Sequence, residues 1–573
     1  MQLLPPVLRL MLLPVLNVLG PIIIGFSLSM LIPLALSLWK NDGASAGFEI
    51  AFCITFFTGL LMWLLTRRYK RELIPRDGFL LVTMAWVLLA LAATIPLYVN
   101  IEGISFVHAF FEATSGITTT CGTILSGLDR LPLSVNFWRC FLAWMGGIGI
   151  LVMAVAVLPL LGVGGSQIFR AESSGPMKEG RLTPRIADTA KAFYNIYLAI
   201  SVACAVCYHF AGMDWDDAIM HTFTTVSLGG YSSHDAGFAY WPGRAVDWVC
   251  VVFLLIGGIN FSMHFIAWRK LSLKVYWKDV ETCGWIGTAA LISIFASFML
   301  VYSKTYTNVY DAIYYGVTNT VFVISTGGFA NTNYGEWPLV VQLMILFGSC
   351  FATCAGSTGG GFKMIRAIAL VKQGNLEFKR ILHPRMVRPL IIGNKVIDKQ
   401  IIFSVMAFLM LYTVIALIST IVFLLSGLDG LTSFSAALAC LNNLGPALGS
   451  LGPSYNFSAL SDFQVLFCCF LMVIGRLELF TVLVLLAVSG ERRQGRTLNK
   501  KDGAPPSFVR LRHQFLLHTP NDGCVVLEAQ FKHFQQRVSS LSEVHRLLDR
   551  RFLFLVQVLA FLKEFVFPFS DGF

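Results

Sequence analysis

Long runs of hydrophobic residues alternate along the chain with short polar connections. Ten runs are long enough to cross the roughly 30 Å hydrocarbon core of a bilayer as helices. The first is longer than the hydrophobic core of a signal peptide and no small-residue cleavage site stands out after it, so we expect a retained helix. The predicted spans are residues 10–38, 46–65, 79–99, 131–163, 192–211, 245–268, 282–302, 337–370, 400–426 and 462–488.

The composition supports this prediction. Of 573 residues, 56% are hydrophobic and 13% are charged, whereas a soluble domain carries about 25% charged residues. The thirteen cysteines lie mostly inside hydrophobic runs, as Cys468 and Cys469 do. We therefore expect buried, inert thiols rather than a metal site or a disulfide framework. The predicted fold class is an all-α polytopic membrane protein.

Lysine and arginine gather in alternate connections. By the positive-inside rule these connections face the cytoplasm, which places the amino terminus and the end of the tenth span there too. The net charge of +11 is then explained by cytoplasmic loops and not by nucleic-acid binding. The basic residues, which follow the second, fourth, sixth and eighth spans, are Arg67, Arg68, Lys70, Arg71 and Arg76; Arg170, Lys178, Arg181 and Arg185; Arg269, Lys270, Lys274 and Lys278; and Lys372, Lys379, Arg380, Arg385, Arg388, Lys395 and Lys399.

Four connections on the opposite side share one pattern. Each has an apolar stretch too short to span, followed by small polar residues and, in three of the four, by glycine. They align without gaps on Cys121, Gly230, Gly328 and Gly445. Because several columns match in all four, we infer one unit of about 100 residues used four times. The matching columns are Ala109, Ala218, Gly316 and Ser433 twelve residues earlier; Ile117, Val226, Ile324 and Leu441 four earlier; and Thr118, Ser227, Ser325 and Asn442 three earlier.

This repeat predicts the domain organisation. Each unit consists of a span, a short helix, a loop and a second span. The predicted segments are 1–70, two amino-terminal helices; 71–170, 171–270, 271–385 and 386–489, four pore repeats of which the third contains an intramembrane loop; and 490–573, an atypical tail.

Four such loops around one pseudo-fourfold axis suit ion conduction. Non-helical backbone at membrane depth is tolerated where protein buries it or water reaches it. Rings of carbonyl groups replace the hydration shell of a potassium ion, and each short helix points its negative carboxyl end at the cation. We expect no covalently bound cofactor, with potassium as the transported ligand. The predicted selectivity filter is Thr119, Thr120, Cys121, Gly122, Leu228, Gly229, Gly230, Thr326, Gly327, Gly328, Asn443, Leu444 and Gly445, with potassium at Thr119, Thr120, Leu228, Gly229, Thr326, Gly327, Asn443 and Leu444.

The chain contains the motifs TVSLGGYSSHD (225–235), CAGSTGGGFK (354–363), NNLG (442–445), IGRLE (474–478), LGVGG (161–165), FRAE (169–172) and LTPRIADTAK (182–191). In these motifs it resembles the membrane subunits of bacterial Trk potassium uptake systems, TrkH and TrkG, in the Trk/Ktr/HKT superfamily. The resemblance runs from the first residues to about residue 488. It implies a homodimer with one pore per subunit, gated by TrkA, a cytoplasmic nucleotide-binding subunit. The basic loops are the expected TrkA surface, although their charge suits anionic membrane lipid equally.

A glycine-rich stretch interrupts the eighth predicted span. The stretch is either a packing kink between helices or a functional break. Broken helices in transporters favour the functional break, and in the resembling family this loop is the gate. Arg476 lies near the middle of the tenth predicted span, where a charge is costly. It serves either as a positive barrier, which the resemblance favours, or as an ion pair that locks helices. The predicted gate is Gly356, Ser357, Thr358, Gly359, Gly360, Gly361 and Arg476.

Cys121 departs from the family pattern, in which this loop reads TTTGAT rather than TTTCGT. A Cβ at a positive φ costs on the order of 1–2 kcal/mol. Either Gly122 takes the flexible role through a one-residue shift, or the first loop directs fewer carbonyls inward. In related plant HKT proteins a serine here accompanies sodium transport. A less selective potassium and sodium transporter and a non-conducting sensor are therefore alternatives; an enzyme is not expected.

Two acidic residues and the tail complete the predictions. Glu112 and Asp217 lie at the short helices, where they either attract cations or, as we favour, brace the helices. The tail beyond residue 488 matches nothing in the family. It contains a hydrophobic run at 552–567 that is short for a span, and it is either a regulatory extension or a functionless change of reading frame.

Overall fold

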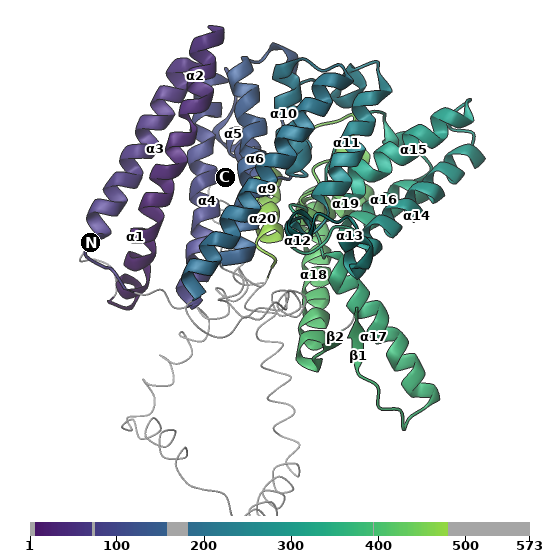
Figure 1. Ribbon diagram of the computed structural model, residues 1–573. Helices are drawn as coiled ribbons and strands as arrows, with labels where there is room; N and C mark the ends of the chain where they lie inside the picture. Colours follow the sequence, from purple (N-terminus) through teal and green to yellow (C-terminus); the bar gives the residue numbers. More distant parts are fainter. Residues whose placement is uncertain (1–5, 72–74, 157–181, 394, 480–573) are drawn as a thin grey trace, which may run out of the picture. The chain divides into compact units, whose positions relative to one another are not determined.

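The computed structural model describes residues 6–71, 75–156, 182–393 and 395–479, which form a mostly helical protein (Figure 1). The predictions for the tail, and for the motifs at 161–165 and 169–172, lie outside the described residues. Two helical elements precede the rest of the fold: α1 (Pro6–Ser29), continued by α2 (Leu31–Lys40), and α3 (Ser45–Thr66). Helices α1 and α3 pack closely at Gly20, where a Cβ would come within 3.0 Å of the Gly59 carbonyl oxygen, as small residues allow in membranes.

Four successions of long helix, short helix, loop and helix follow. Three short helices begin at a side-chain cap: Ser105, Asn308 and Asp429 each accept a hydrogen bond from a backbone N–H in the first turn. The successions are α4 (Pro75–Asn100), α5 (Phe106–Ile117) and α6 (Leu133–Ala156); α9 (Leu182–Ala211), α10 (Trp215–Val226), α11 (Arg244–Gly257) and α12 (Phe261–Lys270); α14 (Val280–Tyr302), α15 (Val309–Ile324), α16 (Leu339–Phe351) and α17 (Met364–Leu382); and α18 (Lys399–Leu425), α19 (Gly430–Asn442) and α20 (Asp462–Arg476).

The remaining elements are short. Helix α13 (Lys274–Lys278) follows α12, and an antiparallel hairpin joins α17 to α18 through β1 (Leu390–Ile392) and β2 (Lys395–Ile397), with Ile391 opposite Val396. Short 3-10 turns lie in the connections that follow the short helices, two of them in the fourth connection. They are η1 (Leu128–Arg130), η2 (Gly237–Tyr240), η3 (Tyr334–Glu336), η4 (Gly449–Leu451) and η5 (Phe457–Ala459).

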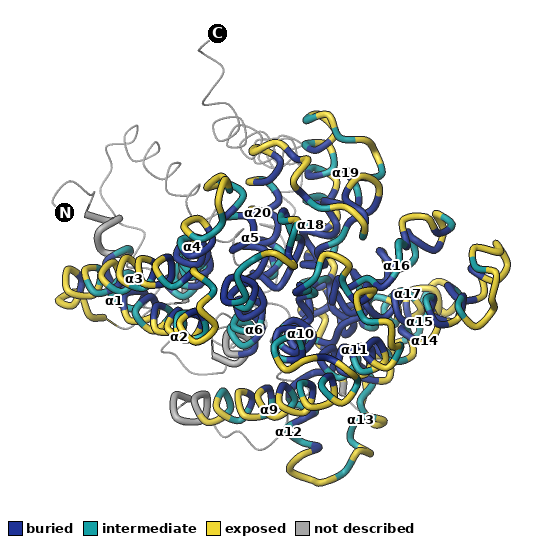
Figure 2. Tube along the Cα trace, turned by 90° about the horizontal axis from the view of Figure 1, so that it is seen from above, coloured by how far each residue is buried: buried dark blue, intermediate teal, exposed yellow. Residues whose placement is uncertain are grey.

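Burial separates the short helices from the long ones. Viewed from above, buried residues gather around α5, α10 and α19, whereas α1, α3 and α9 carry exposed residues at the periphery (Figure 2). The hydrophobic windows of the long helices are 22–39% buried, so most of their apolar surface faces outward. Six described helices are long and apolar enough to span a membrane, and a bent pair makes a seventh. This is an integral membrane protein.

Three predicted spans differ from straight helices. The sixth breaks between α11 and α12, which are bent by 93°, because Gly258 packs against the Trp285 ring and Asn260 caps a new helix. The eighth breaks between α16 and α17, as its glycines predicted. The tenth ends its helix at Arg476, followed by positive φ at Glu478 and Leu479. Arg476 therefore lies at the end of α20, and residues 480–488 of the predicted span lie outside the described residues.

Candidate ion-conduction site

The four loops that follow the short helices share one backbone conformation. Each has a positive φ at the aligned column and again two residues earlier, separated by a residue of negative φ. The pairs are Thr119 (53°) and Cys121 (53°), Leu228 (55°) and Gly230 (98°), Thr326 (61°) and Gly328 (68°), and Asn443 (53°) and Gly445 (89°). The gap-free alignment therefore brings together residues that share the sign of φ. Alternating left- and right-handed residues let successive carbonyls point to the same side of the backbone.

The loops also touch one another in cyclic order. A Cβ on Gly230 would come within 1.9 Å of the Gly327 oxygen in the next loop, and one on Gly328 within 2.3 Å of the Leu444 oxygen. A Cβ on Gly445 would come within 2.6 Å of the Thr120 oxygen, which returns to the first loop. Three of the four junctions thus need a glycine, because the neighbouring carbonyl occupies the place of a side chain.

Cys121 forms the fourth junction, against the second loop. It keeps the left-handed conformation itself, whereas Gly122 has no positive φ, so the one-residue shift is wrong. A Cβ on Gly229 would lie 2.8 Å from the Cys121 Sγ. Gly122 instead packs against Phe457 and its carbonyl accepts a hydrogen bond from Ser115 Oγ at 2.6 Å. The ring formed by the four loops is therefore least symmetric where the first loop meets the second.

Each loop is held against the last turn of its own short helix. The carbonyl six residues before the aligned column accepts a loop N–H in all four cases: from Thr120 to Ser115 at 2.9 Å, Gly229 to Thr224 at 2.7 Å, Gly328 to Phe322 at 2.9 Å and Leu444 to Ala439 at 2.9 Å. The Asn443 side chain joins the fourth loop to the first by donating to Thr120 Oγ1 at 3.0 Å. These bonds fix left-handed residues that would otherwise be costly.

Glu112 and Arg139 brace the first loop from behind. Both side chains are fully buried, and Arg139 Nε lies 2.8 Å from Glu112 Oε1. Glu112 also accepts from Ile124 N at 3.0 Å, while the Arg139 guanidinium stacks 4.4 Å from the centre of the Tyr231 ring. Tyr231 in turn donates to the Glu112 carbonyl at 2.9 Å. Glu112, on α5, therefore braces its short helix against α6, as favoured, and also holds the first loop; its side chain is buried.

Asp217 has a similar supporting role outside the second loop. It accepts from Ser233 Oγ at 2.8 Å and lies 3.1 Å from His234 Nε2. The other ring nitrogen of His234 contacts Asp129, which comes from the connection after the first loop. Asp235 reaches the same connection and accepts from Gly127 N at 2.9 Å. These contacts, which we call the outer clamp, join the first and second units.

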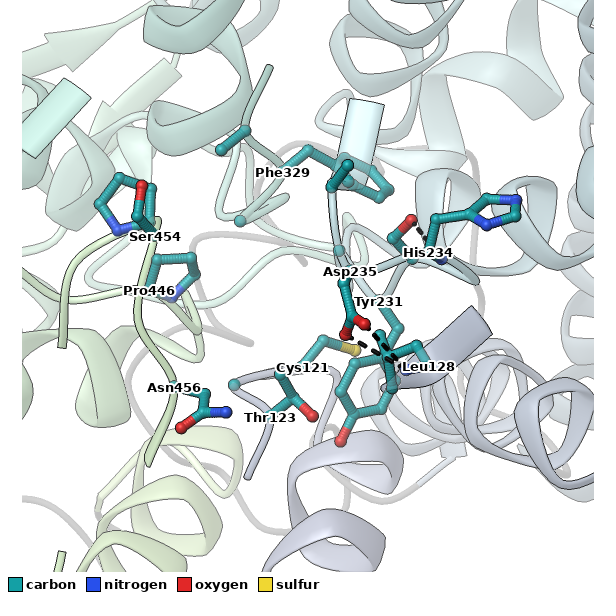
Figure 3. A pocket seen from close by; sticks show the side chains of 18 of the residues that line it. Cys121, Thr123, Leu128, Tyr231, His234, Asp235, Phe329, Pro446, Ser454 and Asn456 are labelled. Atoms are coloured by element: carbon teal, nitrogen blue, oxygen red, sulfur yellow. Dashed lines mark hydrogen bonds between the residues drawn. The ribbon is translucent and has the colours of Figure 1, made fainter. Parts of the chain in front are cut away.

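A cavity of about 520 Å³ opens over the loops. Its floor includes Cys121, Gly230 and Gly328 together with Pro446, which follows Gly445. Figure 3 shows Pro446, Ser454 and Asn456 on one side and Tyr231, His234 and Asp235 on the other. Residues of all four loops or their connections therefore line one open cavity that can hold hydrated ions.

The glycine-rich segment between α16 and α17 lies against the opposite side of the loops. Thr358 Oγ1 donates to the Val226 carbonyl at 3.1 Å, and Gly360 N donates to Thr326 Oγ1 at 3.2 Å. A Cβ on Gly360 would come within 1.9 Å of the Asn442 oxygen. The predicted gate residues 356–361 thus contact the ends of α10 and α19 and the third loop in this conformation.

Arg476 touches the same segment. Its side chain is 3% exposed, and its Nη1 donates to the Thr358 carbonyl at 2.9 Å. Its Nε and Nη2 are buried without a hydrogen-bond partner among the described residues. Glu478 pairs instead with Arg366, so the structure gives Arg476 no helix-locking ion pair within the part of the chain described.

The sequence analysis did not identify two charged residues that contact this segment. Lys363 has a φ of 77°, is 7% exposed and donates through Nζ to the Gly359 carbonyl. Glu281, on α14, accepts from Ala355 N at 2.6 Å and Ile365 N at 3.2 Å. A lysine at the end of a glycine run was a visible signal, whereas Glu281 is distant in sequence and reads as an ordinary residue at the start of a span.

Comparisons with known proteins agree with this geometry. The family model TrkH, described as "Cation transport protein", matches residues 44–494. The Trk system potassium uptake protein TrkH of Vibrio parahaemolyticus is 41% identical over 82% of this chain and 98% of its own length. TrkH of Escherichia coli K12 is 39% identical over 82% and 97%, and TrkG of the same strain is 35% identical over 81% and 95%.

A solved structure is also similar. The crystal structure of the potassium transporter TrkH from Vibrio parahaemolyticus superposes with a TM-score of 0.77 at 39% identity, covering 83% of this chain and 98% of that one. The resemblance drawn from the sequence motifs is therefore confirmed. The chain belongs to the TrkH family of cation transport proteins.

Proposed function

We propose that this protein takes up potassium across the bacterial inner membrane, along a path between the four loops. The observation that carries the proposal is the cyclic contact of the loops, in which three of the four junctions set a carbonyl of one loop against the aligned glycine of another and the fourth sets Cys121 against Gly229. The names of the relatives as potassium uptake proteins support the choice of ion. Basic connections support an amino terminus in the cytoplasm.

The selectivity filter in this proposal consists of four pseudo-symmetric repeats. Carbonyls of Thr119 and Thr120, and of their equivalents in the other three loops, replace the water around the ion. The carboxyl ends of α5, α10, α15 and α19 aim their negative dipoles at the site. The left-handed residues at Thr119, Leu228, Thr326 and Asn443 support this role, since costly conformations persist where function requires them.

The gate in this proposal is the segment 356–361 together with Arg476. The segment contacts the ends of α10 and α19 and the third loop, on the face that we assign to the cytoplasm, and the buried guanidinium adds a positive charge beside it. Opening moves the segment away from the Val226 and Asn442 carbonyls. We further propose that the protein acts as a homodimer and that a TrkA-like nucleotide-binding subunit moves the segment from the cytoplasm.

One observation favours a second candidate, a less selective transporter of potassium and sodium. Cys121 replaces glycine at the junction of the first and second loops, so that one quarter of the ring carries a Cβ where the other three do not. A displaced carbonyl there weakens discrimination between the ions. The third candidate, a non-conducting sensor on the same scaffold, has no comparable support.

Ion flux in liposomes separates these functions. The purified protein is reconstituted with and without a TrkA-like subunit, and influx of potassium and of sodium is measured. Flux that prefers potassium supports the proposal. Comparable flux of both ions favours the less selective transporter, and no flux under either condition would leave the sensor.

A further inference from the structure

A second cavity opens at the periphery of the helix bundle, between α9, α11, α12, α13 and α14. Its volume is about 870 Å³. Its walls are apolar and include Ile200, Phe253, Ile256, Trp268, Leu273 and Trp277. We call it the elbow groove, because it lies along the 93° bend between α11 and α12.

The corner between α12 and α13 carries hydrophobic side chains with little cover. Trp268 is 70% exposed, Leu271 91%, Leu273 73% and Trp277 75%. Leu271 has a φ of 46°, which ends α12 and turns the chain into α13. Two tryptophans and two leucines this exposed suit the boundary between hydrocarbon and headgroups, where tryptophan is enriched.

Positive charge surrounds the same corner. Arg269, Lys270, Lys274 and Lys278 alternate with the exposed hydrophobic residues, and none has an ion pair among the described residues. The nearest acidic residues in sequence are engaged: Asp279 caps α14 through Thr282 N at 2.8 Å, and Glu281 is buried against Ala355. The rim of the groove is therefore uncompensated positive charge, which complements an anionic headgroup.

We propose that the elbow groove binds an anionic phospholipid. Its acyl chains lie along α9, α11 and α14, and its headgroup is bound by Arg269, Lys270 and Lys274. The occupant is a lipid rather than a soluble anion because the walls are apolar, and the basic rim favours an anionic headgroup over a zwitterionic one.

The bend also contacts the glycine-rich segment. Phe261 N donates to the Gly356 carbonyl at 3.1 Å, and Cys354 N donates to the Gly258 carbonyl at 3.0 Å. On the same side, Trp285 Nε1 donates to the Leu255 carbonyl at 3.1 Å. A lipid that supports the bend therefore supports the two backbone bonds that hold the segment. The strength of these two backbone hydrogen bonds is measured by hydrogen exchange, so this part of the proposal does not depend on the proposed transport function.

Native mass spectrometry of the purified protein tests the binding. Phosphatidylglycerol and phosphatidylcholine are titrated separately. We expect Arg269→Gln/Lys270→Gln/Lys274→Gln to weaken phosphatidylglycerol retention about tenfold or more, and Ala199→Trp, which fills the groove, to remove one bound lipid. Lys379→Gln/Arg385→Gln/Arg388→Gln and Leu198→Trp are the matched controls, since these exposed positions lie outside the groove.

Three results would overturn the proposal. Retention that is the same in the groove variants and their controls removes the site. Equal retention of phosphatidylcholine removes the headgroup assignment. A shift from dimer to monomer with unchanged lipid identifies a second copy of the chain as the occupant. Hydrogen exchange at Phe261 and Cys354 should slow with phosphatidylglycerol in the wild type alone; an unchanged rate would overturn the link to the segment.

Discussion

Gly230 lies so close to the Gly327 carbonyl that a Cβ on Gly230 would come within 1.9 Å of that oxygen. The two residues belong to successive loops, so the contact reports how the loops meet rather than how either one folds. The equivalent contacts at Gly328 and Gly445 make the arrangement cyclic. The close contact between the loops therefore depends on these glycines, and the proposed ion path lies between those loops.

The first prediction concerns this junction. Gly230→Ala adds a Cβ that the Gly327 carbonyl does not accommodate, at a φ of 98°. We expect potassium flux in liposomes to fall at least tenfold and the protein to lose about 1–2 kcal/mol or more of stability. Gly212→Ala is the control, because Gly212 has a φ of 114° but open space around it. Equal flux in Gly230→Ala and the wild type would contradict the account.

The second prediction concerns Cys121. Cys121→Gly removes the Cβ at a φ of 53°, so we expect a gain of about 1–2 kcal/mol in stability and a higher ratio of potassium to sodium flux. Cys121→Ala, which keeps the Cβ, should behave as the wild type does. If alanine and glycine change the flux ratio equally, the thiol rather than the Cβ determines selectivity.

The third prediction concerns Arg476. Arg476→Gln removes a buried positive charge while keeping a group able to donate to the Thr358 carbonyl, which the wild-type Nη1 reaches at 2.9 Å. We expect potassium flux without a regulatory subunit to rise, on the order of tenfold. Arg130→Gln, on the outer side, should leave flux unchanged. A fall in Arg476→Gln flux, with an intact fold, would show that the guanidinium assists conduction.

The fourth prediction concerns pH and the outer clamp. Burial acts to lower the pKa of His234, but its hydrogen bonds and charge interactions with Asp217 and Asp129 outweigh burial and raise this pKa above the ordinary value. The hydrogen bond from His234 is the largest of the effects that lower the pKa of Asp129. Protonated His234 therefore stabilises the fold below its ordinary pKa, and this contribution is lost as pH rises through the raised pKa.

Thermal unfolding between about pH 6 and pH 8 checks this prediction. The wild type should lose more stability over that interval than His234→Gln, by roughly 0.2–1 kcal/mol, as expected for a partly exposed ion pair. The exposed His383→Gln serves as the control and should follow the wild type. Parallel pH profiles for His234→Gln and the wild type would show that the clamp does not titrate in this range.

The sequence predicted the four loops because their aligned residues obey a local rule. Glycine at Gly230, Gly328 and Gly445 marks positive φ and close approach. The second left-handed position in each loop was invisible, because Thr119 and Leu228 are residue types that rarely adopt it. Hydrogen bonds from the loops to the preceding helices impose it, and these involve backbone atoms that composition does not reveal.

Other differences have the same kind of cause. Hydropathy averaged over a window does not detect a change in the direction of the chain. The sixth span was therefore predicted as one helix, although it bends at Gly258. The end of α20 at Arg476 was missed because the following residues are also apolar. Glu281 and Arg366 contact residues far away in sequence, and spacing along one chain carries no signal for such pairs.

The most direct test of the central claim is the position of the ion. Rubidium, which scatters anomalously and substitutes for potassium, is soaked into crystals of the protein and located by anomalous diffraction. The account predicts a peak on the axis between the four loops, beside the carbonyls of Thr120, Gly229, Gly327 and Leu444. Rubidium bound only in the outer cavity, or at sites away from the loops, would contradict it.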